Sequence, residues 1–85
     1  MIPGGWQMFE NIPQKYMEVY NKIKPNLKNG EYTPLAVASC QVGSETVCFI
    51  CRTINQSQKE YFSKVMVHIG IGEEPKFESA REIFL

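Results

Sequence analysis

The sequence predicts an α+β fold in which one long helix packs on a four- to five-stranded antiparallel sheet. Near the N-terminus, apolar residues recur at the period of a helix. β-compatible stretches separated by short turn signals follow. Because short loops make neighbouring strands pair as hairpins, the strands should form a meander. The 85 residues suit a single domain spanning 1–85 with one modest core.

Residues 11–28 are predicted to form the helix. Apolar side chains recur along one face at the 3.6-residue period: Ile12, Tyr16, Val19, Tyr20, Ile23 and Leu27. Asn11 can cap the start, and Pro13 fits the first turn, where a missing N–H costs nothing. Pro25 removes one backbone hydrogen bond and should kink the last turn. The helix therefore ends either near Lys24 or at residue 28.

The rest of the chain alternates between strands and turns. The predicted strands are 33–42, 46–54, 60–69 and 76–85. The turn signals between them are Gly43-Ser44, Asn55–Gln58 and Gly70–Pro75. A short stretch near Gly5–Met8 could add an edge strand. Within 60–69, the side chains that should share one face are Tyr61, Ser63, Val65, Val67 and Ile69.

Charge and composition exclude several classes of partner. Nine basic and nine acidic side chains cancel, which argues against a nucleic-acid footprint or an electrostatic membrane anchor. No run of about 18 apolar residues is present, so no segment should span a bilayer. An odd number of cysteines and no basic start followed by an apolar run indicate reduced thiols. We therefore expect a cytoplasmic protein without nucleic-acid or membrane partners.

The chain begins with a short apolar arm, Met1-Ile2-Pro3-Gly4-Gly5. Pro3 stiffens its tip, and the two glycines permit backbone angles that other residues resist. Ordering a free terminus costs conformational entropy. Two interpretations are open: a frayed terminus, or a segment kept for a partner.

The three cysteines raise the question of a metal or redox site. Cys48 and Cys51 form a Cys-x-x-Cys pair, but residues three apart in a strand point to opposite faces and cannot share an ion. We expect both thiols to be buried and inert. Cys40 could lie opposite Cys48 across the first hairpin, where oxidation would form a disulfide. His68 is alone, so no catalytic triad is expected.

Several short motifs, in this order, resemble the cystatin superfamily and, in detail, its type-1 members, the stefins. The resemblance covers nearly the whole chain: a free arm with Gly-Gly, one helix, and a four-stranded meander with two hairpin tips. The matching motifs are Met1-Ile2-Pro3-Gly4-Gly5, Lys22-Ile23-Lys24-Pro25-Asn26-Leu27, Leu35-Ala36-Val37, Gln41-Val42-Gly43 and the strand that begins near Tyr61. The resemblance implies a cystatin-like fold.

The two hairpin tips depart from the stefin pattern. The first tip reads Gln41-Val42-Gly43-Ser44-Glu45 in place of the Gln-Val-Val-Ala-Gly motif. An ungapped match would turn Arg52 inward, where an unpaired charge is costly. A tip shorter by one residue turns Arg52 outward and points Val47, Phe49 and Cys51 inward, and we favour it because a one-residue slip flips every side chain. The second tip lacks the Leu-Pro or Pro-Trp of the family.

The resemblance implies reversible, competitive inhibition of papain-like cysteine proteases of the cathepsin type, without catalysis, metal or cofactor. In stefins, the arm and both tips enter the protease cleft together as a wedge. The residues that would bind the protease are Met1, Ile2, Pro3, Gly4, Gly5, Gln41, Val42, Gly43, Ser44, Ile69, Gly70 and Ile71. The resemblance also implies a monomer that can exchange strands through the first hairpin to form a domain-swapped dimer.

Two other functions and one local question stay open. The altered tips favour, as an alternative, a non-inhibitory cystatin-fold module for protein binding or assembly. An enzyme or redox protein that uses Cys48 and Cys51 is a third hypothesis. A variant with both cysteines replaced by serine that keeps its full function would refute it. Trp6 either packs over the helix or sheet edge, or extends the contact surface.

Overall fold

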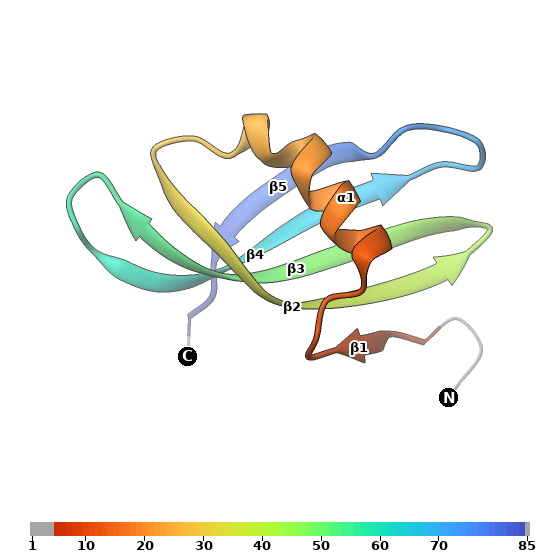
Figure 1. Cartoon of the computed structure of the whole chain (residues 1–85), viewed down its shortest axis with the longest axis horizontal. Coiled ribbons are helices and arrows are strands. Elements are labelled where there is room, and N and C mark those ends of the chain that lie inside the picture. Colours follow the sequence, from red (N-terminus) through yellow and green to blue (C-terminus); the bar gives the residue numbers. More distant parts are fainter. Residues whose placement is uncertain (1–4, 85) are drawn as a thin grey trace.

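The computed structural model describes residues 5–84, and its one α-helix lies across one face of a sheet (Figure 1). The elements, in chain order, are β1 (Gln7–Phe9), α1 (Gln14–Ile23), a 3₁₀ turn η1 (Lys24–Asn26), β2 (Gly30–Val42), β3 (Ser44–Asn55), β4 (Glu60–Ile69) and β5 (Lys76–Glu82). All neighbouring strands pair antiparallel in the order β1-β2-β3-β4-β5. This confirms an α+β fold with five strands.

The strands match the predicted meander, with shifts at their ends. β4 has the predicted bounds. β2 begins earlier than predicted, at Gly30, and ends as predicted at Val42, β3 is longer than predicted at both ends, and β5 stops at Glu82. The edge strand expected near Gly5–Met8 is β1, which pairs Gln7 with Ser39 and Phe9 with Val37. The register of β2 against β3 shifts between Pro34 and Ala36, a β-bulge next to a proline that cannot donate to the ladder.

The helix is shorter than predicted and does not begin at its predicted cap. α1 has ten residues, starts after Pro13 and has no side-chain hydrogen bond at its N-cap, so the predicted start at Asn11 is wrong. Its end at Ile23 agrees with the shorter of the two predicted ends, near Lys24. Pro25 lies in η1, where 3₁₀ geometry accommodates the lost backbone bond. Leu27 still packs against the core beyond the helix.

The core lies between α1 and the inner face of the sheet. Its buried members are Tyr16, Tyr20 and Ile23 from the helix and Val37, Val47, Phe49, Cys51, Val65 and Val67 from the strands. The Tyr20 and Phe49 rings meet edge to face with centroids 5.3 Å apart, a favoured aromatic geometry. Along β4, Ser63, Val65 and Val67 are buried, which confirms the predicted face.

The first hairpin turns on a single residue. Val42 pairs with Ser44, and Gly43 between them has a φ of 74°, a left-handed conformation that glycine adopts without steric cost. This short tip turns Val47, Phe49 and Cys51 inward and leaves Arg52 exposed, as predicted.

The sequence allowed a pairing of Cys40 with Cys48 across the first hairpin, and the structure does not form it. Because the turn centres on Gly43, Cys40 lies opposite Thr46, and Cys48 lies opposite Ala38. The two cysteines are therefore diagonal neighbours. Diagonal Cα atoms lie about 7–8 Å apart, beyond the separation that a disulfide spans without backbone movement.

Candidate functional site

The two hairpin tips meet at one end of the sheet, which we call the tip end. The first tip is Gln41–Ser44, and the second tip is Ile69–Ile71. Glu45, directly after the first tip, pairs with Gln41 on one side and with Ile69 on the other. Both connections therefore lie at the same end of the sheet (Figure 1).

The first tip presents a small, exposed apolar surface. Gln41, Val42 and Gly43 are exposed, with Val42 at 69%. A Cβ at Gly43 would meet no atom within 4 Å, so the space beside the turn is open. The backbone of this tip is accessible to a partner.

The second tip adds another exposed apolar side chain. Ile71 is 80% exposed, and Ile69 is half-buried against the core. The Glu73 N–H donates to the Gly70 carbonyl over 3.0 Å and closes a turn at this tip. An ion pair of 2.8 Å between Lys22 and Glu74 links the same loop to α1.

The root of the N-terminal arm points toward the tip end. β1 runs antiparallel to β2, so the chain leaves Gln7 toward the end of β2 that carries the first tip. Gly5 is half-buried, whereas the predicted site residues Met1, Ile2, Pro3 and Gly4 lie outside the described residues. Trp6 is 51% exposed. The structure thus brings the root of the arm and both predicted tips to one end.

A partly buried hydrogen-bond network lies behind the first tip. The Tyr16 hydroxyl is 2.9 Å from Ser39 Oγ and 2.6 Å from Glu45 Oε2. Burial, together with the hydrogen bond to Glu45, raises the pKa of Tyr16. The sequence-based site omitted Glu45, although its inward position follows from the alternation of Val47, Phe49 and Cys51.

The cysteines lie on different faces of the sheet. Cys51 is fully buried, as predicted, whereas Cys48 is only half-buried, so the prediction that both are buried is wrong. Burial raises the pKa of the Cys51 thiol to about 12 and also raises that of Cys48. Among residues 5–84, no group of three or more His, Cys, Asp or Glu side chains is arranged to hold a metal ion.

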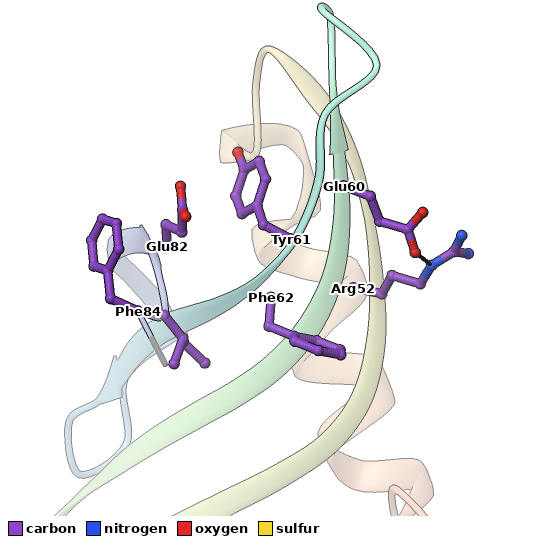
Figure 2. Close-up of a pocket in the computed structure, with 7 residues that line it drawn as sticks. Arg52, Glu60, Tyr61, Phe62, Glu82 and Phe84 are labelled. Atoms are coloured by element: carbon purple, nitrogen blue, oxygen red, sulfur yellow. Dashed lines mark hydrogen bonds and ion pairs between the residues drawn. The ribbon is translucent and has the colours of Figure 1, made fainter.

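A separate hollow lies at the opposite end of the sheet (Figure 2). It has a volume of about 470 Å³ and is lined by Arg52, Glu60, Tyr61, Phe62, Glu82, Ile83 and Phe84. Arg52 Nε donates to Glu60 Oε1 over 2.6 Å at its rim. None of its lining residues belongs to the predicted protease-binding set.

Comparisons with known proteins assign the chain to no family. Within the part of the chain that the structure describes, no helix is long and apolar enough to cross a membrane. Searches of family models, curated proteins and solved structures found no match to the chain.

Proposed function

We propose that this protein is a cystatin-like, stefin-type inhibitor that reversibly and competitively occupies the active-site cleft of papain-like cysteine proteases. The observation that carries the proposal is the meeting of both hairpin tips and the root of the arm at one end of the sheet. A helix on a five-stranded antiparallel meander is compatible with the cystatin fold that the sequence motifs resemble.

The exposed apolar side chains support a binding role for the tip end. Val42 and Ile71 extend from neighbouring tips and are mostly exposed. Burying an aliphatic side chain contributes about 1.5–3 kcal/mol before the costs of ordering. Met1, Ile2 and Pro3 would add contacts on the non-primed side of the cleft, with Gly4 and Gly5 carrying the backbone past the catalytic cysteine.

Inhibition would follow from occupation of the active-site cleft of the protease, without cleavage of any bond. The first tip would offer exposed backbone to the cleft, and the second tip would add an apolar contact on the primed side. We therefore propose a cytoplasmic, non-enzymatic monomer, with strand exchange through the first hairpin as the route to a dimer.

Titration of active papain tests this function. We expect the full chain to inhibit competitively, and a chain lacking residues 1–5 to inhibit more weakly because it loses the arm contacts. Absence of inhibition by the full chain at micromolar concentration would refute the proposal. Equal inhibition by the two chains would remove the arm from the mechanism.

A non-inhibitory binding or assembly module is the second candidate. The one-residue turn at Gly43 favours it, because this tip differs from the Gln-Val-Val-Ala-Gly motif of stefins. Under this alternative, papain activity is unchanged by the full chain, and the tip end binds a protein that is not a protease.

A further inference from the structure

Tyr16 contacts parts of the chain that are far apart in sequence. Its ring lies against Phe9 of β1, with centroids 5.8 Å apart. Its hydroxyl reaches Ser39 of β2 and Glu45 of β3. The ring is buried at 3% exposure, so this one side chain joins the helix to three strands.

The direction of the two hydrogen bonds follows from the groups involved. A phenol carries one hydrogen, and an ionised carboxylate can only accept. Tyr16 therefore donates to Glu45 over 2.6 Å, and the Ser39 hydroxyl donates to the Tyr16 oxygen over 2.9 Å. The bond to the carboxylate is charge-assisted and is the stronger of the two.

Glu45 lies between the two tips. It is the cross-strand partner of Gln41 in the first tip and of Ile69 in the second. Phe9 ends the strand whose other end leads to Gly5 and the arm. Fixing Glu45 and Phe9 from one side chain therefore fixes the arm root and both tips relative to α1.

We infer that Tyr16 is a positioning residue that holds the arm root and the two tips in one arrangement, through its contact with Phe9 and its hydrogen bond to Glu45. A consequence, which rests on the proposed function, is that this bond pre-organises the tip end for a protease. Pre-organisation strengthens binding because less ordering remains to be done in the complex.

The chain offers a matched control for the removal of this hydroxyl. Tyr20 is equally buried on the same helix, and its hydroxyl donates to the Tyr32 carbonyl over 2.9 Å, away from the tips. Tyr16→Phe and Tyr20→Phe each delete one hydroxyl from one buried tyrosine. Glu45→Gln keeps an acceptor for Tyr16, whereas Glu45→Ala removes it.

Hydrogen exchange of the folded full chain tests the positioning role directly. We expect backbone amides at 44–47 and 69–71 to exchange about fivefold faster in Tyr16→Phe than in Tyr20→Phe, a factor that corresponds to one net hydrogen bond. Glu45→Ala should resemble Tyr16→Phe, and Glu45→Gln should stay nearer to wild type. Equal exchange at the tips in the two tyrosine variants would overturn the inference.

Papain titration tests the consequence for binding. We expect the inhibition constant to rise about fivefold for Tyr16→Phe and to stay within twofold for Tyr20→Phe. An equal rise for both variants would overturn the role in pre-organisation. If the wild-type chain does not inhibit papain, the proposed function fails, and the exchange measurement alone decides the positioning role.

Discussion

Two cysteines three residues apart have different environments because a strand alternates its faces. Cys51 points into the core beside Phe49 and Tyr20, while Cys48 lies on the other face, opposite Met66. Burial disfavours the thiolate, which raises the pKa of Cys51 to about 12 from its ordinary value of 9.0. Position on the pleat, and not the Cys-x-x-Cys spacing, sets the chemistry of these residues.

The raised pKa of Cys51 predicts a loss of stability at alkaline pH. A group whose pKa is higher in the folded state stabilises that state fully below its unfolded pKa, and the stabilisation is lost as pH rises through the folded pKa. The window for Cys51 is therefore pH 9 to about 12. Urea unfolding of the wild type should show the free energy of unfolding falling by about 1 kcal/mol between pH 9 and 10.

Cys51→Ala provides the control for this pH dependence. It removes the titrating thiol, so its stability should fall less steeply over the same interval, even though the variant is less stable at neutral pH. Tyrosines such as Tyr20, whose pKa is also raised to about 12, contribute only above pH 10. Parallel curves for the two proteins would contradict the assignment to Cys51.

At the scale of elements, the first hairpin shows how one glycine sets a register. The turn centred on Gly43 brings Val42 opposite Ser44 and so fixes every pair along β2 and β3 as far as the bulge next to Pro34. A shift by one residue would turn Arg52 into the core. The conformation of this turn therefore decides both the shape of the tip and the packing of the sheet.

Gly43→Ala should destabilise the protein through its backbone alone. An added Cβ meets no atom within 4 Å, but φ is 74°, where an L-residue costs about 1–2 kcal/mol. A loss near 1 kcal/mol should lower the Tm by roughly 4–8 °C. Gly43→Asn should cost less, since asparagine tolerates this region. Equal melting temperatures for Gly43→Ala and wild type would argue against strain at the tip.

At the scale of the whole molecule, the meander brings three separate segments to one end. The antiparallel order places the β2–β3 and β4–β5 connections together, and β1 directs the arm root the same way. The hollow beside Phe62 and Phe84 lies at the opposite end (Figure 2). Substitutions at the two ends should therefore have separable effects.

A charge at each tip should abolish most of the proposed binding. Val42→Asp combined with Ile71→Asp places carboxylates where two exposed apolar side chains would be buried. We expect the papain inhibition constant to rise about 100-fold, which corresponds to about 2.8 kcal/mol. Leu35→Asp, at an exposed position of β2 outside the tips, should stay within twofold. Comparable losses in both proteins would contradict a localised site.

The features that could be predicted from the sequence are those that depend on the pattern of neighbouring residues. The alternation of Val47, Phe49 and Cys51 and of Ser63, Val65 and Val67 is a property of neighbouring residues, so the inward face of the sheet could be predicted. The choice between a helix end near Lys24 and one at residue 28 could not be made, because it depends on packing against the core. The tips were expected at one end from the resemblance to stefins, whereas Glu45 was missed because its partner Tyr16 lies 29 residues away.

Periodicity and turn residues act over short distances, so the order of amino acids was enough to predict the α+β class, the succession of strands and the side of each strand that faces the core. The folded chain was needed to establish the ten-residue length of α1, the placement of Cys40 opposite Thr46, and the link from Tyr16 to Glu45. These features depend on strand register and on contacts between segments that are distant in sequence. Local patterns are compatible with more than one such arrangement, and packing of the whole chain selects one of them.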